Sequence, residues 1–128
     1  MKDFETMKDA VQFRITESLE EYFFEDYVEK AVKIFTADIG ATIEYIRNEC
    51  TDEEFYWLSE IFERIAEKSQ SMEFIDTLRE RLSKVVRDEY NQKAFKSEYM
   101  RTYVDYDKYI RELKEEIAFA DGQILDYD

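Results

Sequence analysis

The chain has 128 residues, with 32 acidic and 18 basic side chains, a formal net charge of -14, and neither His nor Pro. The lack of His excludes a Ser-His-Asp triad, a Cys-His pair and an HExxH zinc helix. One Cys and two Gly exclude an internal disulfide, a cysteine-built metal cage, a GxGxxG turn and a P-loop. We therefore expect a binding protein rather than an enzyme, with no catalytic residues, no cofactor and no metal site.

The overall composition predicts one globular unit. The length fits a single helical domain spanning residues 1–128, and a hydrophobic content of 45% is sufficient for a core. The first residues are acidic where a signal peptide is basic, and no segment approaches the roughly 18 apolar residues of a membrane span. A single thiol suits a reducing compartment. We expect a cytoplasmic protein with no membrane partner.

The first half of the chain has apolar residues at intervals of three and four, which predicts helices. One helical region is expected at about 3–25 and a second at about 26–48, with Gly40 as the weak point of the second. The apolar stripe of the first region consists of Phe4, Met7, Val11, Ile15, Leu19 and Tyr22.

A capping box marks the start of the next helix, because the Thr51 hydroxyl and the Glu54 carboxylate can each bind the other residue's backbone N–H. This helix should run to about Lys68, and the short polar joint 69–71 should precede another helix. The expected core residues of these two helices are Phe55, Leu58, Phe62, Ile65, Phe74, Ile75, Leu78, Leu82 and Val85.

The periodicity weakens after Asp88, which predicts a loop or a short helix before a last helix that stops near Gly122. The whole pattern predicts an all-α fold, either a single-domain bundle or a stack of helical hairpins, with about five helices. The expected core stripe of the last helix is Tyr99, Tyr103, Tyr106, Ile110, Leu113 and Ile117.

The acidic residues are concentrated in the first half of the chain. Residues 1–64 contain 7 basic and 17 acidic side chains, whereas residues 65–128 contain 11 and 15. Two stretches, 15–29 and 48–63, have no Lys or Arg. A field of one sign steers an oppositely charged partner toward the protein, so these stretches are candidate binding surfaces.

A helical wheel of residues 52–68 places Tyr56 off the core face, among five carboxylates. This arrangement has two interpretations: a solvated helix face with one Tyr at its margin, or a protein interface anchored by that Tyr. The other acidic stretch, 15–29, which includes Phe24, is the next candidate surface. The candidate partner-binding residues are Asp52, Glu53, Tyr56, Glu60, Glu63, Glu67, Glu17, Glu20, Glu21 and Phe24.

Other chemistry receives little support from the sequence. No EF-hand loop accompanies the carboxylates, and no acidic pair stands out as a glycosidase site among the 32 acids. Cys50 has acidic neighbours that raise the pKa of a thiol, so we interpret it as a packing residue, and Trp57 as a residue packed between helices. The charge of -14 disfavours direct nucleic-acid binding.

Residues 51–82 contain the pattern DEEFxWLSExFE followed by an SxS joint. This quarter of the chain resembles a group of small acidic helical immunity proteins of bacterial polymorphic toxin systems, including those of contact-dependent growth inhibition. The resemblance implies a cytosolic inhibitor that binds a cognate toxin domain, often a basic nuclease, and blocks its active site or an adjacent surface. No residue role is implied beyond this segment.

Two functions therefore stand as hypotheses. The first is a toxin-neutralising immunity protein that acts by stoichiometric occlusion through an acidic, aromatic-containing face. The alternative is a phage-type DNA mimic that inhibits a restriction or CRISPR nuclease, with carboxylates spread over a long face in imitation of phosphates. An acid-base enzyme of another kind is a third, weaker hypothesis. The sequence leaves the identity of the partner and the oligomeric state open.

Overall fold

A computed structural model describes residues 4–17 and 21–125, without the side chains of Glu21 and Tyr22. The described residues form eight α-helices and three 3₁₀ helices and contain no strand, which confirms the all-α prediction. The helices are α1 (Met7–Thr16), α2 (Glu21–Ala37), α3 (Ile39–Asn48), α4 (Asp52–Leu58), η1 (Ser59–Ile61), α5 (Phe62–Ser69), α6 (Met72–Ser83), η2 (Arg87–Glu89), η3 (Gln92–Ala94), α7 (Glu98–Tyr103) and α8 (Tyr106–Asp121).

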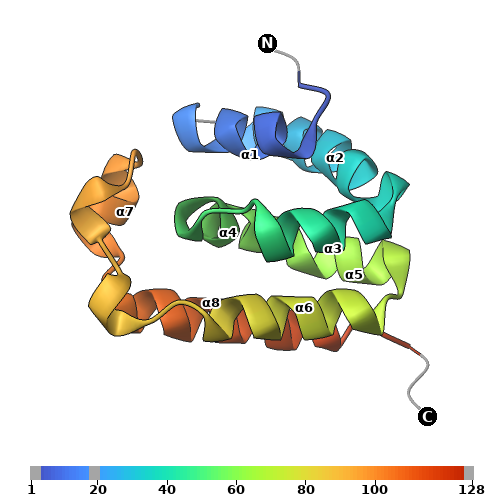
Figure 1. Ribbon diagram of the computed structural model, residues 1–128. Coiled ribbons are helices and arrows are strands. Elements are labelled where there is room, and N and C mark those ends of the chain that lie inside the picture. Colours follow the sequence, from blue (N-terminus) through green and yellow to red (C-terminus); the bar gives the residue numbers. More distant parts are fainter. Residues whose placement is uncertain (1–3, 18–20, 126–128) are drawn as a thin grey trace.

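The helices are stacked in three layers (Figure 1). Helices α1 and α2 form the first layer, α3, α4 and α5 the second, and α6 and α8 the third. Contacts between α1 and α4, α2 and α5, α3 and α6, and α5 and α8 join neighbouring layers. The short helix α7 lies at one side of the stack, on the left in Figure 1. This arrangement is consistent with the predicted all-α bundle, with more helices than the five expected.

Polar caps divide the predicted helical regions into shorter helices. The first region is two helices, because α1 ends with Glu17 as its C-cap and α2 begins at Glu21. The second region breaks at Asp38 rather than Gly40, since the Asp38 side chain accepts a hydrogen bond from the backbone N–H of Ala41 (3.2 Å). The Asp38 cap satisfies a backbone N–H that has no partner within the helix. Leu19 of the first predicted stripe lies outside the described residues.

The helix predicted at 52–68 is also interrupted. Its capping box is present, with Thr51 and Glu54 bonded in both directions (3.0 and 3.1 Å), but the 3₁₀ turn η1 separates α4 from α5. A 3₁₀ turn has three residues per turn instead of 3.6, so it rotates the following helix relative to the preceding one. A single helical wheel therefore cannot place the side chains of both α4 and α5.

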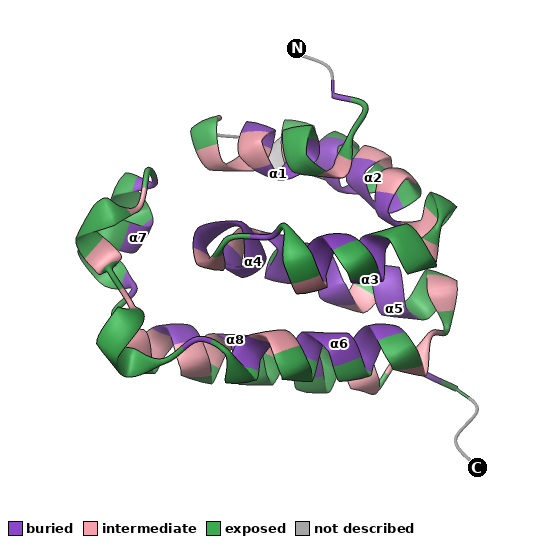
Figure 2. Ribbon diagram, in the orientation of Figure 1, coloured by how far each residue is buried: buried purple, intermediate pink, exposed green. Residues whose placement is uncertain are grey.

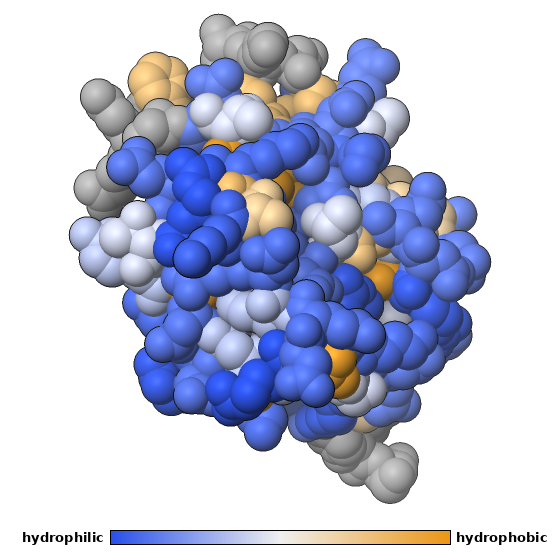
Figure 3. Space-filling model, turned by 60° about the vertical axis from the view of Figure 1, so that its left-hand side comes forward, coloured by the Kyte–Doolittle hydropathy of each residue, from blue (hydrophilic) through white to orange (hydrophobic). Residues whose placement is uncertain are grey.

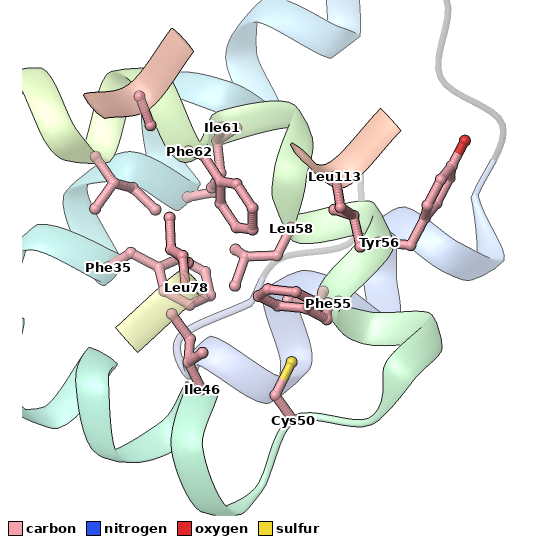
Figure 4. Packing of buried hydrophobic residues seen from close by; sticks show 14 of the residues in the cluster. Phe35, Ile46, Cys50, Phe55, Tyr56, Leu58, Ile61, Phe62, Leu78 and Leu113 are labelled. Carbon is pink, nitrogen blue, oxygen red and sulfur yellow. The ribbon is translucent and has the colours of Figure 1, made fainter. Parts of the chain in front are cut away.

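The hydrophobic core lies between the layers. Figure 2 shows buried residues in every layer, whereas α7 is largely exposed. Phe62, which is fully buried, lies near the rings of Phe55 (5.4 Å between centroids) and Phe74 (6.3 Å), and Figure 4 shows side chains of α2, α3, α4, α6 and α8 in the same cluster. The core residues predicted for 52–85 are all buried. Cys50 is buried as expected of a packing residue, and burial raises the pKa of its thiol to about 12.

The stripe predicted for the last helix is only partly correct. Tyr99 and Tyr103 are 44% and 61% exposed, whereas Leu113 and Ile117 are buried. The reason is a second interruption: α7 ends at Tyr103, and Asp105 caps a separate helix by accepting from the backbone N–H of Lys108 (2.8 Å). The chain turns between the two helices, so Tyr99 and Tyr103 of α7 do not lie on the same face as the core residues of α8.

We expect Phe62→Ala to lower the free energy of unfolding by about 3–5 kcal/mol, because it leaves a cavity at the meeting point of the layers. Phe119→Ala is the matched control, since Phe119 is 54% exposed on α8 and its truncation removes little buried area. Urea unfolding followed by circular dichroism measures both changes. Equal losses in the two variants would contradict this description of the core.

The buried Glu54 carboxylate predicts a pH dependence of stability. Burial alone would raise its pKa, but hydrogen bonds from the Thr51 backbone and Gln12, together with the charge of Lys8, hold the pKa below its ordinary value. The ionised Glu54 therefore stabilises the folded protein fully above the pKa that Glu54 has in the unfolded chain. This stabilisation is lost as the pH falls through the pKa that Glu54 has in the folded protein. Glu54→Gln should cost about 1–3 kcal/mol at pH 7 and progressively less below about pH 4.

Unfolding curves measured from neutral to acidic pH test this expectation. Glu89→Gln is the matched control, because Glu89 is exposed in η2. The control should follow the parent chain at every pH. A Glu54→Gln variant that is equally destabilised at neutral and acidic pH would show that the Glu54 charge is not the stabilising feature.

Candidate functional site

Tyr56 is not the exposed residue that the sequence predicts. It is 9% exposed and belongs to the hydrophobic core cluster, with its ring stacked on Tyr109 (5.7 Å between centroids). Its hydroxyl donates a hydrogen bond to Glu112 (3.0 Å), and in Figure 4 it points away from the labelled core side chains. Burial and the Glu112 carboxylate both raise the pKa of Tyr56. The prediction was wrong because α8 covers this side of α4.

Two of the predicted carboxylates, Asp52 and Glu53, have hydrogen-bond partners within the protein. Asp52 accepts a hydrogen bond from the Arg81 guanidinium (2.7 Å). Glu53 is 8% exposed, and its two oxygens accept from the backbone N–H groups of Lys96 (3.0 Å) and Ser97 (2.8 Å). The prediction that Glu53 lies off the core is therefore wrong: its side chain attaches the segment before α7 to α4.

Of the other three members of the predicted ring, Glu60 lies within η1, and Glu63 and Glu67 follow it on α5. Glu60 forms a two-point ion pair with Arg14 of α1, at 2.8 and 3.0 Å. Glu63 is half-buried and Glu67 is exposed, both on α5. The five carboxylates do not form a ring around Tyr56, because η1 rotates α5 away from the wheel position that a continuous helix would give.

The second predicted surface is only partly described. Glu17 is half-buried at the end of α1, and Phe24 of α2 is half-buried, with its ring 5.4 Å from the Arg14 guanidinium carbon. Glu20 lies outside the described residues, and Glu21 belongs to α2 with its side chain outside the description. Of this set, Phe24 contacts Tyr27, a buried core residue (6.2 Å between centroids).

Around the Tyr56 hydroxyl, five elements enclose a cavity of about 480 Å³. We call it the aromatic–acidic pocket. Helices α4 and α7 supply aromatic side chains, α8 and η1 supply carboxylates, and α1 supplies one guanidinium. Its principal lining residues are Tyr56, Trp57, Tyr99, Glu60, Glu112, Glu116 and Arg14.

The aromatic wall of the pocket continues onto the surface. Trp57 lies 6.2 Å from Tyr99, and Tyr99 lies 5.5 Å from Tyr103, measured between ring centroids. The last two residues are exposed, and the Lys108 ammonium lies 5.5 Å from the Tyr99 ring. Figure 3 brings the α7 side forward and shows small paler patches within a mainly hydrophilic surface. Both tyrosines of α7 therefore expose part of their ring surface to solvent.

The acidic wall has a concentrated negative charge. Glu112 and Glu116 lie one turn apart on α8, and neither forms an ion pair within the described part of the chain. Burial raises the pKa of Glu116, and the nearby carboxylates of Glu63 and Glu112 raise it further. Three carboxylates against one guanidinium leave the pocket negative, and negative charge beside aromatic rings favours a cation.

A second cavity of about 520 Å³ lies between α6 and α8, with apolar side chains such as Leu82 and Ile117 beside the cations Arg79 and Lys114. Within residues 4–17 and 21–125, no group of three or more Cys, Asp or Glu is arranged to hold a metal ion. None of the helices in those ranges is long and apolar enough to cross a bilayer.

Sequence reasoning missed five pocket residues. The spacing of Glu112 and Glu116, four apart on one helix, is a signal that a wheel of the last helix would have shown. No local sequence pattern indicates that this face of the last helix lies against Trp57 or Tyr99. The missed residues are Arg14, Trp57, Tyr99, Glu112 and Glu116.

The raised pKa of Glu116 gives a direct test of the acidic wall. Glu63→Gln should lower the pKa of Glu116 toward its ordinary value, because it removes one of the charges that oppose ionisation. Glu67→Gln, one turn further along α5 and exposed, is the control and should leave that pKa unchanged. Carbon-13 NMR titration of the carboxyl groups measures both. Equal shifts in the two variants would contradict the arrangement.

No protein-family model, no curated protein and no solved structure shows a significant match to this chain. A functional assignment therefore depends on the chemistry of the aromatic–acidic pocket and the exposed tyrosines beside it. Both favour a positively charged partner.

Proposed function

We propose that the chain is an immunity protein that binds one basic toxin domain in the cytoplasm and neutralises it by stoichiometric occlusion, without turnover. The observation that supports this most is the aromatic–acidic pocket, where Glu112 and Glu116, which form no ion pair with any described residue, lie on the same side of the molecule as exposed tyrosines. The all-α fold agrees with the fold that the resemblance of residues 51–82 implies.

The side chains around the pocket are those that anchor protein interfaces. Trp, Tyr and Arg supply most of the binding energy in measured interfaces. Here Trp57 and Arg14 line the pocket, and Tyr99 and Tyr103 extend it onto the surface. Rings at these positions can bury apolar area against a partner, while the carboxylates select its charge. The net charge of -14 would also accelerate encounter with a basic protein.

A nuclease toxin fits this chemistry. A nuclease is positively charged where it holds phosphate, so its active-site surface is complementary to the acidic wall. A bound inhibitor of this size would exclude the nucleic acid from that surface. The block could act on the active site or on an adjacent surface, and the same pocket would serve either mode.

The DNA-mimic alternative receives less support. It requires carboxylates spread over a long face, but the acids of the stretch 48–63 are largely committed to internal partners. Glu53 binds backbone N–H groups and Glu54 is fully buried, while Asp52 and Glu60 pair with arginines. A partner would meet a pocket with aromatic anchors rather than a row of phosphate-like charges.

Co-expression with the product of the gene immediately upstream tests the proposal. The immunity function predicts that the upstream product is toxic alone, that this chain removes the toxicity, and that the two proteins copurify in a 1:1 complex. Absence of toxicity together with absence of a complex would refute it. Inhibition of several unrelated DNA-binding nucleases would instead identify the DNA mimic.

Within such a complex, Tyr103→Ala should weaken toxin binding at least tenfold, because it removes an exposed anchor without disturbing the core. Phe119→Ala is the control, since Phe119 is similarly exposed but does not line the pocket or contact the α7 tyrosines. Calorimetry measures the affinities. If Tyr103→Ala and Tyr99→Ala both bind as tightly as the parent chain, the interface lies elsewhere. Tyr56→Ala is unsuitable, since Tyr56 is buried.

A further inference from the structure

We infer that the aromatic–acidic pocket receives one arginine side chain of the partner, with the guanidinium between the Trp57–Tyr99 wall and the Glu112–Glu116 wall. The inference rests on the proposed function, because it assumes a basic protein partner. It adds the chemical group that is recognised and the residues that recognise it.

The protein already holds a guanidinium in one half of this pocket. The Arg14 guanidinium carbon lies 4.7 Å from the centre of the Trp57 ring, and its nitrogens bind both oxygens of Glu60 at 2.8 and 3.0 Å. Stacking on an indole combined with a two-point bond to a carboxylate is the arrangement that suits a guanidinium. The Arg14 contacts show that Trp57 and Glu60 provide that chemistry at the pocket.

The other half of the pocket has the same kinds of groups, but its two carboxylates form no ion pair within the described residues, and the Lys108 ammonium lies 5.5 Å from the Tyr99 ring rather than at those carboxylates. Glu112 accepts from the Tyr56 hydroxyl through Oε1, and no interaction engages its Oε2 within the described residues. Glu116 has neither a hydrogen bond nor an ion pair there. The ring of Tyr99 lies 6.2 Å from the Trp57 ring, which the Arg14 guanidinium carbon also approaches at 4.7 Å. A second guanidinium would meet two carboxylates and an aromatic face.

The pocket discriminates between arginine and other groups. Its volume of about 480 Å³ is within the range of pockets that hold small ligands, so one long side chain fits. A planar guanidinium can stack on Tyr99 and bind two carboxylates at once, whereas an ammonium acts as a point charge. A phosphate or a carboxylate would be repelled by the two glutamates. We therefore expect the order arginine, then lysine, then neutral side chains.

Trp57 provides the measurement, because it is the only Trp in the sequence and lines the pocket. Its fluorescence and its indole N–H resonance report on ligands that enter. The probe is Nα-acetyl-arginine amide, compared with the lysine amide and with the citrulline amide, which is neutral and nearly isosteric. We expect saturable changes with arginine, and at least tenfold weaker binding of citrulline. Equal responses to arginine and citrulline would overturn the inference.

Two variants separate local recognition from the general negative field. Glu116→Gln should weaken arginine binding at least fivefold. Glu115→Gln makes the same charge change at the adjacent position of α8, where the side chain is exposed and does not line the pocket, so it should bind as the parent chain does. Equal weakening in both variants would refute recognition by the pocket. Circular dichroism of each variant verifies that α8 remains folded.

The arginine inference and the proposed function can fail separately. A chain that neutralises the toxin but shows no response to the arginine amide would refute the arginine inference and leave the immunity function standing. A chain that binds the arginine amide but neither protects cells nor forms a complex would refute the immunity function and leave the arginine pocket standing.

Discussion

The start of α4 organises the molecule through two adjacent buried carboxylates. Glu54 accepts hydrogen bonds from the Thr51 backbone and from Gln12 of α1 (3.0 and 2.9 Å), while Glu53 accepts from the two backbone N–H groups that precede α7 (3.0 and 2.8 Å). Consecutive residues thereby join three elements that are distant in the sequence. The positive end of the helix dipole favours both charges at this position.

This constraint also determines where the pocket forms. Helix α1 carries Arg14 and α7 carries Tyr99, so the elements that α4 holds in place supply opposite parts of the pocket. Trp57 lies on α4 itself, within ring-contact distance of Tyr99 and beneath the Arg14 guanidinium. A buried carboxylate that loses its partners is strongly destabilising. Stability and the geometry of the pocket therefore depend on the same contacts.

The large acidic excess is divided between two roles. Asp52, Glu53 and Glu54 are used within the fold, where arginine, lysine or backbone N–H groups satisfy them. Glu112 and Glu116 line the pocket without an ion pair to any described residue, and burial, followed by repulsion from Glu63 and Glu112, raises the pKa of Glu116. A partner's cation would relieve that repulsion, which links the unusual charge of the chain to a specific place on its surface.

The sequence by itself determined the helical fold, the capping box and the core of residues 52–85, because helix periodicity and caps depend on residues within about four positions of one another. It could not determine that η1 rotates α5, that α8 covers Tyr56, or that Glu53 turns inward. Those outcomes depend on contacts with Arg14, Lys96 and Glu112, which are remote from α4 in the chain. A sequence pattern also does not distinguish a carboxylate that faces water from one that binds another part of the protein. Only the tertiary structure decided which acids form the pocket, since it alone brings α1, α4, α7 and α8 together.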